Sequence, residues 1–449
     1  MKKQDPINHY LSNYAAGNQW QLVAGSKKDF LRVVVIPAYA EKELLFSTLV
    51  SLARNPRPDL KDTFILCVVN NKMNAPETVR QNNRQTMQYL DLLVAGKNLA
   101  NYDSVSISAE EGQLLQDAGL NIGYINASSP GLEIPENTGG VGMARKIGMD
   151  MALRLLPPED YERRLIISLD ADTLVRDNYL REIQNHFQRK INTAVVAYEH
   201  QNPQPAAARE AICYYEIFLR YWVLGLQYAD SPYAFHSIGS TIVCTAGAYL
   251  AVRGMNRREA GEDFYFLNKL AKTGKIGYIR STCVYPSARI SGRVPFGTGK
   301  AMQRRLEAEE NEYCLYDPEV FAILKQWLQI MKNPGDLSSE NIMQQAAAIH
   351  PALAEFLKIN SFASIWLKIR HNANDEKVLT RQFHDWFDGF KTLKLINYLS
   401  REPFPRINMF KALSRFFAMD NQPDNDLLFA GCNSPEIRLR IINNLRKRT

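Results

Sequence analysis

The sequence has few of the features that mark a secreted, zinc-bound or membrane-spanning protein. Its six cysteines are scattered without closely spaced pairs, which argues against a disulfide framework and against a zinc site. Residues 1–18 are polar and lack the apolar stretch of a signal peptide. Residues 211–228 come nearest to a long apolar run, but charged and amide side chains interrupt them, so we expect an amphipathic or buried helix there. A cytoplasmic location follows as the expectation.

Several common catalytic motifs are also missing. The sequence has neither the HExxH motif of zinc proteases nor the GxSxG motif of serine hydrolases. The stretch Gly140-Val141-Gly142 is followed by Arg145 where a dinucleotide-binding fingerprint needs its third glycine. Residues 297–300 lack the first glycine and the Ser/Thr of a P-loop, and the seven histidines show no ligand spacing. A dehydrogenase, a P-loop kinase and a serine hydrolase are therefore disfavoured.

The composition is that of an ordinary globular protein with a modest positive charge. Of the 449 residues, 46% are hydrophobic and 22% are charged, and the formal net charge is +7. This charge suits a protein that handles phosphorylated ligands, and it does not require a nucleic-acid partner, which we do not expect.

Short apolar runs alternate with helical periodicity in the first part of the chain. Apolar runs at residues 31–36, 64–69, 121–125 and 165–169 predict buried strands. Helices are predicted at residues 41–52, from Asn74 as N-cap, and at 138–156. This alternation predicts a doubly wound α/β domain. From about residue 302 onward the periodicity is mostly helical, which predicts a helical accessory domain.

Two acids follow the strand predicted at residues 165–169. Because side chains two apart on a strand point the same way, we expect Asp170 and Asp172 to converge at the carboxyl end of the strand, where α/β sheets bind ligands. Two close carboxylates repel unless a hard cation lies between them, so this pair suggests Mg²⁺ or Mn²⁺ together with a phosphorylated ligand. The alternative is a pair of solvated loop acids.

Three further segments carry charge at positions suited to chemistry. Arg145 and Lys146 lie near the start of their helix, where backbone N–H groups already attract anions, although a first-turn arginine packed on the sheet would look the same. Glu262 and Asp263 open another helix, either as first-turn acids that favour the helix dipole or as a base for an attacking hydroxyl. Arg293 lies in the segment 287–299, either as a solvated arginine or as a cation for a departing anion.

Taken together, these segments resemble the inverting GT-A glycosyltransferases of family 2. Residues 35–41 are similar to the opening strand and nucleotide loop of that family, and residues 142–148 to its Gly-x-Ala-Arg-Asn-x-Gly helix start. Asp170-Ala171-Asp172 matches the metal motif, and Glu262-Asp263 the acceptor-base motif. The four pieces occur in the family's order, and the resemblance covers roughly residues 30–300.

The resemblance implies a GT-A fold, a Rossmann-like doubly wound domain with a mixed sheet, and transfer of a sugar from a UDP- or GDP-linked donor to an acceptor hydroxyl with inversion. It implies Asp172 as a ligand of Mn²⁺ or Mg²⁺, with Asp170 near the ribose or the metal. Asp263 would deprotonate the acceptor, with Glu262 beside it and Arg293 on the leaving group. The implied nucleotide-sugar site comprises Pro37, Ala38, Tyr39, Glu41, Asn70, Arg145, Lys146 and Asp170, with Arg145 on the base.

The domain boundaries predicted on this basis are a lead-in over residues 1–29, a GT-A domain over 30–300 with an insertion at about 80–135, and a helical accessory domain over 301–449. The sequence departs from the family where its second strand ends, because Asn70 and Asn71 stand in place of an acid. Amides still donate and accept hydrogen bonds, so base recognition would be altered and not lost.

Several alternatives remain open at this point. The chain could be a retaining GT-A transferase, a nucleotide-sugar-binding scaffold without turnover, or a nucleotidyltransferase. The acceptor could be a carbohydrate, a lipid-linked molecule or another small molecule. Apolar residues from 407 to 417 near Lys411 and Arg415 suggest either a core helix or peripheral contact with the inner face of a membrane.

Overall fold

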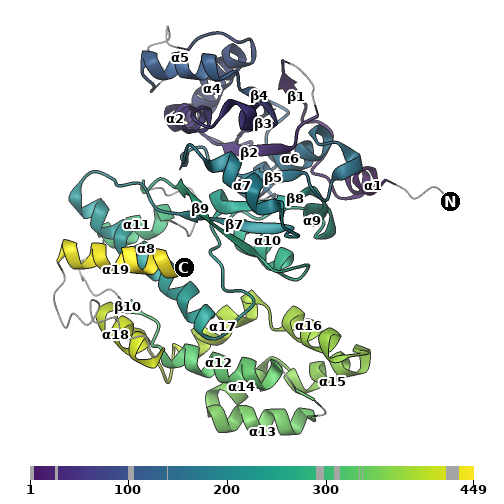
Figure 1. The fold of residues 1–449 in the computed structure, drawn as a ribbon, viewed down its shortest axis with the longest axis vertical. Helices are drawn as coiled ribbons and strands as arrows, with labels where there is room; N and C mark the ends of the chain where they lie inside the picture. The colour runs from purple at the N-terminus through teal and green to yellow at the C-terminus, as the bar shows by residue number, and fades with distance from the viewer. Residues whose placement is uncertain are drawn as a thin grey trace. The chain divides into compact units, whose positions relative to one another are not determined.

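The computed structural model describes residues 5–25, 29–99, 106–138, 140–289, 298–307, 314–332, 334–335, 337–420 and 434–449. The chain forms two compact units (Figure 1). Unit 1 comprises residues 1–203 and 237–300, and unit 2 comprises residues 204–236 and 301–449.

Unit 1 is built on a nine-stranded mixed sheet in the order β1-β4-β3-β2-β5-β8-β7-β9-β6. Its strands are β1 (Leu22–Ala24), β2 (Arg32–Ala38), β3 (Thr63–Asn70), β4 (Asn121–Ala127), β5 (Leu165–Ser168), β6 (Leu174–Val175), β7 (Thr193–Tyr198), β8 (Ile242–Thr245) and β9 (Gly277–Tyr285). Strands β4, β3, β2 and β5 run parallel to one another, whereas β8 is antiparallel to both β5 and β7. The predicted α/β class with a mixed sheet is therefore confirmed.

The central strands are completely buried, as their apolar runs predict. Every residue of β2, β3 and β5 is buried, because a parallel sheet is covered on both faces. The helices of unit 1 are α1 (Pro6–Asn13), α2 (Lys42–Ala53), α3 (Arg57–Lys61), α4 (Glu77–Val94), α5 (Ala109–Ala118), α6 (Gly140–Leu155), α7 (Tyr179–Phe187), α9 (Ala246–Ala251) and α10 (Glu262–Ala271). Helix α6 packs on β2, β3 and β5, while α2 lies beside α4 and α5 (Figure 1).

Two details of the predicted local structure are wrong. Helix α4 begins at Glu77 with Pro76 as its N-cap, not with Asn74, because a proline disfavours helical backbone in the residue before it. Strand β5 ends at Ser168, so Asp170 and Asp172 lie on a turn after the strand, closed by the Thr173 N–H donating to the Asp170 carbonyl at 3.1 Å.

In the part of unit 2 that the structure describes, the strands are β10 (Cys314–Leu315) and β11 (Ile407–Asn408), which pair with each other, and the other elements are helices. Its helices are α8 (Ala206–Tyr228), α12 (Glu319–Lys332), α13 (Ser339–Ile349), α14 (Pro351–Ile359), α15 (Phe362–Asn372), α16 (Glu376–Trp386), α17 (Gly389–Leu399), α18 (Met409–Met419) and α19 (Pro435–Arg448); α11 (Thr298–Glu307) spans the boundary between the units. Trp327 is fully buried against the rings of Phe362 and Phe383. The expected C-terminal helical region is thus present.

The two compact units differ from the predicted domains in two places. The predicted domain boundaries remain a proposal. Residues 22–24 of the predicted lead-in form β1, which pairs with β4 of the sheet. Residues 204–236 group with the C-terminal helices because α8 packs along α19 and α12. None of the helices in the described part of the chain has the length and apolar character that crossing a membrane requires.

Candidate functional site

The carboxyl ends of the parallel strands meet at one edge of the sheet. From β2 the chain first adds β3 and β4 on one side and then returns to add β5 on the other. The order of the strands therefore reverses at β2, and α/β sheets bind ligands in the crevice outside such a reversal. The loop after β2, the asparagines that end β3 and the turn after β5 all lie at this edge.

A buried arginine, Arg145 of α6, contacts the end of β5, the turn after β5 and the start of α10. Its Nε donates to Oε1 of Glu262 at 3.1 Å, its Nη1 to the hydroxyl of Ser168 at 2.6 Å, and its Nη2 to Oδ1 of Asp170 at 2.5 Å. The side chain is only 3% exposed. Burial would lower the pKa of Arg145, but the carboxylates of Asp170 and Glu262 outweigh burial and raise it. The guanidinium is therefore a permanent cation that ties the turn after β5 to the start of α10.

Three glycines let Arg145 and its helix come this close. A Cβ on Gly239 would lie 2.1 Å from Nη2 of Arg145, and one on Gly142 would lie 2.4 Å from the carbonyl oxygen of Arg258. A Cβ on Gly148 would lie 2.3 Å from Cγ1 of Val35 on β2. Packing thus explains the two glycines of the motif over residues 142–148. Gly142 lets the backbone at Arg258 approach α6, and Gly148 lets the side chain of Val35 on β2 pack against it.

The two acids after β5 have different partners. Asp170 accepts from Arg145 and, through Oδ2, from the hydroxyl of Ser240 at 2.5 Å. Asp172 instead pairs with Arg289, whose Nη2 lies 2.9 Å from Oδ2 of Asp172 and also contacts Oε1 of Glu41. Strand alternation does not determine where these two side chains point, because β5 has already ended at Ser168. Each carboxylate nevertheless keeps a partly exposed side chain, 32% for Asp170 and 20% for Asp172.

The third acidic position is the start of α10, where Gly261 adopts a left-handed conformation as N-cap with φ at 68°. Glu262 is buried beside Arg145, and Asp263 accepts the N–H of Phe264 at 2.7 Å. Burial, followed by the neighbouring Glu262 carboxylate, raises the pKa of Asp263 to about 7. Burial also raises the pKa of Glu262, against the opposing effect of Arg145. A carboxyl group with a pKa near neutrality suits a general base.

The remaining predicted site residues are placed as follows. Pro37 and Ala38 end β2, and Tyr39 and Glu41 occupy the following loop, with Glu41 buried. Asn70 ends β3 at the same edge, but its Nδ2 donates to the Ala38 carbonyl at 3.2 Å and the Val68 carbonyl at 3.0 Å. Arg293 lies outside the described residues.

Lys146 is not brought together with the other predicted residues. Its ammonium donates to the hydroxyl of Tyr10 at 2.7 Å and lies 3.2 Å from Oδ2 of Asp150. Asp150 also accepts from Tyr249 at 2.7 Å. Lys146 therefore belongs to a buried polar cluster that fastens α1 to α6, away from Arg145. Burial, opposed by Asp150, lowers the pKa of Lys146.

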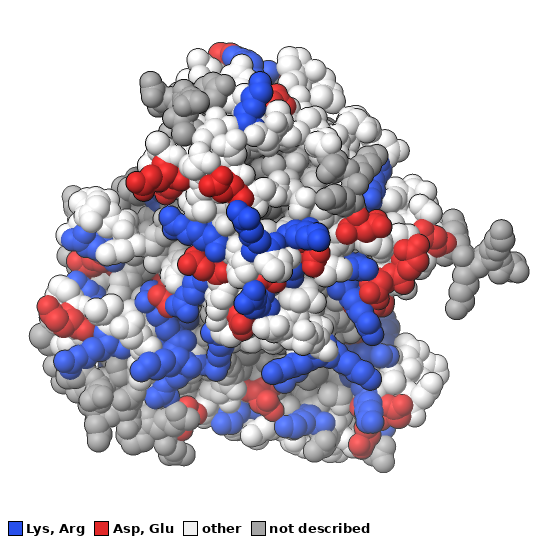
Figure 2. Space-filling view, turned by 45° about the horizontal axis from the view of Figure 1, so that its top comes forward, with Lys and Arg blue, Asp and Glu red and all other residues white. Residues whose placement is uncertain are grey.

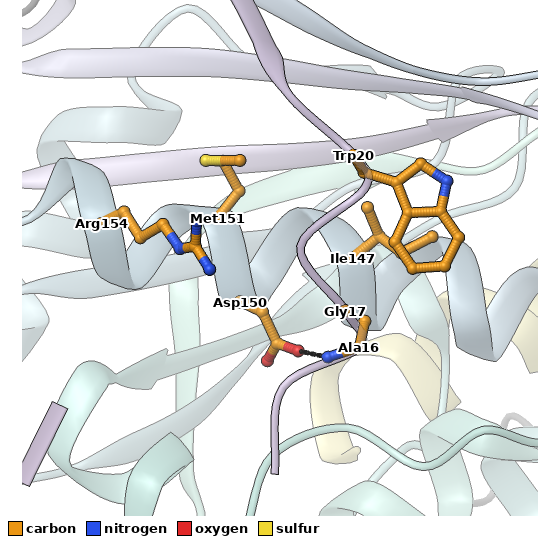
Figure 3. A pocket seen from close by; sticks show the side chains of 7 residues that line it. All are labelled: Ala16, Gly17, Trp20, Ile147, Asp150, Met151 and Arg154. Carbon is orange, nitrogen blue, oxygen red and sulfur yellow. Dashed lines mark hydrogen bonds between the residues drawn. The ribbon is translucent and has the colours of Figure 1, made fainter. Parts of the chain in front are cut away.

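A small pocket opens on α6 where the N-terminal segment crosses it (Figure 3). Asp150 accepts the N–H of Ala16 at its edge, at 2.7 Å. The pocket is lined by Ala16, Gly17, Trp20, Ile147, Asp150, Met151 and Arg154. None of these seven residues is a predicted site residue, so this pocket does not coincide with the acidic edge of the sheet.

Three residues at the site were not assigned from the sequence: Arg289, Ser240 and Asn83. Arg289 lies in the same segment as Arg293, and the sequence pattern predicts a role for Arg293 alone. Ser240 carried no signal because its role depends on contact with Asp170, which lies 70 residues away in the chain. Asn83 lies in a polar run on α4 and carries no signal in the sequence, because its contact with Ala40 spans 43 residues of the chain.

The side chains at this edge of the sheet supply only some of the ligands that a divalent cation needs. Among the residues that the structure describes, no group of three His, Cys, Asp or Glu side chains could hold a metal ion. Magnesium commonly binds through one or two carboxylates plus phosphate oxygens and water, so Asp172 and Asp170 suffice if a diphosphate supplies the other ligands.

On the face of the molecule drawn in Figure 2, basic side chains are interspersed with acidic ones.

Comparison with known proteins gives one family match. Residues 165–328, which include β5, both acids after it, and α10, match the model of glycosyl transferase family group 2. No curated protein matches the chain.

Two solved structures align over most of the chain. The chain is similar to Staphylococcus aureus TarS 1-349 in complex with UDP-GlcNAc, at 13% identity and a TM-score of 0.36, covering 92% of this chain and 89% of that one. It is also similar to the mannosyltransferase PcManGT from Pyrobaculum calidifontis in complex with GDP-Man and Mn²⁺, at 12% identity and a TM-score of 0.36, covering 85% and 94%.

Proposed function

Because residues 165–328 match the model of glycosyl transferase family group 2, we propose that this chain is a glycosyltransferase that moves a sugar from a UDP- or GDP-linked donor to an acceptor hydroxyl, with inversion and with a divalent cation. The observation that carries the proposal is the contact of Arg145 with both Asp170 and Glu262. This contact holds the donor side and the acceptor side of the site in one fixed arrangement, as an in-line displacement requires.

On the acceptor side, Asp263 is the base. The acceptor oxygen forms a bond to the anomeric carbon, the bond from that carbon to the diphosphate oxygen breaks, and the hydroxyl proton passes to Asp263. The raised pKa of about 7 makes the carboxylate basic enough to accept this proton while it remains ionised in a large fraction of molecules near neutrality. Glu262 acts through Arg145 as a positioning residue.

On the donor side, the loop after β2 and the turn after β5 enclose the nucleotide and its diphosphate. Pro37, Ala38, Tyr39 and Glu41 line this side, and Asn70 supports it through its bond to the Ala38 carbonyl. We assign Arg145 a positioning role instead of direct contact with the base, because each of its guanidinium nitrogens already has a protein partner. Lys146 keeps a structural role in the cluster around Asp150.

The cation, Mn²⁺ or Mg²⁺, would be held by Asp172, with Asp170 as the second carboxylate. When bound, it would neutralise the negative charge that develops on the leaving diphosphate. Arg289 lies between Asp172 and Glu41, so a guanidinium already occupies the space next to the principal metal ligand. Its position also suits contact with a diphosphate, in the role first expected of Arg293.

The acceptor is proposed only as a hydroxyl of a carbohydrate, a lipid-linked molecule or another small molecule. A cytoplasmic location, with peripheral contact at the inner face of a membrane as its extension, is likewise part of the proposal. The helix that suggested membrane contact, α18, buries Leu413 and Phe417, as a helix of the core does.

The direct test is a screen of UDP- and GDP-linked sugars with Mn²⁺ or Mg²⁺, monitored by release of nucleoside diphosphate. We expect release with one donor, and its loss in Asp263→Asn with donor binding retained. Release of pyrophosphate would indicate a nucleotidyltransferase. Binding without turnover by the unaltered chain would indicate a scaffold, and a product that keeps the donor's anomeric configuration would indicate a retaining enzyme.

A further inference from the structure

The loop after β2 contains a strained residue that is held from outside the loop. Ala40 has φ at 51°, in the left-handed region, which a residue with a Cβ adopts only when its surroundings impose it. The N–H of Ala40 donates to Oδ1 of Asn83 at 2.9 Å. Asn83 belongs to α4, so a helix that is 43 residues away in the chain fixes the conformation of this loop.

Asn83 is also joined to the ends of two neighbouring strands. Its side chain is fully buried, and its Nδ2 lies 3.0 Å from the Asn70 carbonyl, 2.9 Å from Oδ1 of Asn71 and 3.1 Å from the hydroxyl of Ser128. Asn70 ends β3, and Ser128 follows the last residue of β4. One amide group therefore fastens the chain beyond β2, β3 and β4 at the edge of the sheet where we place the nucleotide.

The neighbouring residue on α4, Asn82, contacts the start of α2. Oδ1 of Asn82 accepts the N–H of Lys42, the first residue of α2, at 3.0 Å. Glu41 is the N-cap residue of α2, yet its side chain makes no capping hydrogen bond and instead pairs with Arg289. Asparagine is a poor residue for a helix interior, so two in a row on α4 cost helix stability that these contacts offset.

We propose that Asn83, with Asn82, positions the nucleotide-binding loop. This inference rests on the proposed function and adds residues to the same site. Asn83 keeps Ala40 in its left-handed conformation, and this turn of the backbone directs the next side chain, Glu41, towards Arg289 and Asp172. Asn82 supplies the cap that Glu41 would otherwise provide. The amides of α4 thus set the geometry of the donor side without touching the donor.

The test uses Asn83→Ala in the full chain, with Asn55→Ala as the matched control. Asn55 is a buried asparagine of the same unit, 3% exposed, whose Oδ1 accepts the Leu180 N–H at 2.9 Å. Both variants lose a buried amide, so both should lower the melting temperature. Only Asn83→Ala should weaken binding of UDP or GDP with Mn²⁺, by about tenfold, since one hydrogen bond that holds the loop is lost. Equal losses of affinity in both variants would overturn the proposal.

A second change tests whether Asn83 acts through Ala40. Glycine adopts positive φ without steric cost, so Ala40→Gly added to Asn83→Ala should restore several-fold of the lost affinity. No restoration would overturn the proposal, because it would mean that Asn83 matters for some reason other than the backbone at Ala40.

Hydrogen exchange tests whether Asn83 holds the loop at Ala40, independently of nucleotide binding. In Asn83→Ala, amides in peptides covering residues 38–44 should exchange at least tenfold faster than in Asn55→Ala, because the Ala40 N–H loses its acceptor. Unchanged exchange there would overturn the role of Asn83. If the unaltered chain binds neither UDP nor GDP, the proposed function fails, and the exchange result still shows whether Asn83 holds the loop.

Discussion

Replacing Arg145 by methionine removes the guanidinium that lies between Asp170 and Glu262. Methionine retains much of the length and apolar volume of the arginine stem, so the main change is the loss of charge and of three hydrogen bonds. Glu262, whose side chain is 6% exposed, would be left as a buried acid without its cation. Its pKa, already raised by burial, should rise further.

The expected cost follows from this burial. Removing one partner of a buried ion pair costs about 3–5 kcal/mol, because the other charge stays buried without compensation. Neutralising that charge should recover part of the cost, so we expect Arg145→Met with Glu262→Gln to be more stable than Arg145→Met alone by about 1 kcal/mol or more. Arg154→Met on the same helix is the control, since Arg154 is exposed and its replacement should change stability by no more than about 0.5 kcal/mol.

Hydrogen exchange of the β5 amides in increasing urea measures the stability of unit 1 without a contribution from unit 2. We expect the Arg145→Met variant to lose protection on β5 and to release no nucleoside diphosphate. If Arg145→Met matches Arg154→Met in both measurements, Arg145 does not join the two sides of the site, and the arrangement proposed for catalysis is refuted.

Four further predictions concern the base, the packing of α6 and the metal. Because Asp263 must be ionised to accept a proton, kcat/KM should rise about tenfold per unit below a pH of about 7 and level off above it; a flat profile from pH 5 to 8 would contradict this assignment. Because the pKa of Asp263 is raised, the folded state binds more protons than the unfolded state between about pH 4 and 7, and the free energy of unfolding falls as pH rises through this window. Asp263→Asn should therefore raise the melting temperature at pH 8 but not at pH 4. Gly148→Ala should cost about 1–3 kcal/mol in thermal unfolding because its Cβ would meet Val35, whereas Gly140→Ala, with nothing within 4 Å, should be neutral; equal melting temperatures would contradict the packing argument. Asp172→Asn should weaken Mn²⁺-dependent UDP or GDP binding by about tenfold or more, measured by calorimetry, and the exposed Asp177→Asn should not; the same affinity in both would exclude Asp172 as a ligand.

The parts of the fold that depend on local patterns could be predicted from the sequence. Buried parallel strands need continuous apolar runs, and those of β2, β3 and β5 are visible without any structure. The start of α10 was equally visible, because Gly261 and the two acids after it are typical of a helix beginning.

The partners of the site residues could not be predicted in the same way. Arg145 and Glu262 are 117 residues apart in the chain, and no local pattern indicates that they touch. The adjacent residues Arg145 and Lys146 looked alike in sequence but point to different clusters, because successive side chains on a helix are about 100° apart. The different partners of Asp170 and Asp172 have no local signal either, because β5 ends one residue before the end of the apolar run and the two acids lie on a turn.

The anomeric configuration of the first product tests the central claim most directly. An α-linked nucleotide-sugar donor that passes the screen is mixed with acceptor, and the product is observed by NMR before any equilibration of its anomers. Displacement by an acceptor hydroxyl that Asp263 deprotonates predicts a β-linked product, which Asp263→Asn should form at a rate lower by a factor of about 10² or more. An α-linked product, or the same rate in Asp263→Asn, would contradict the account.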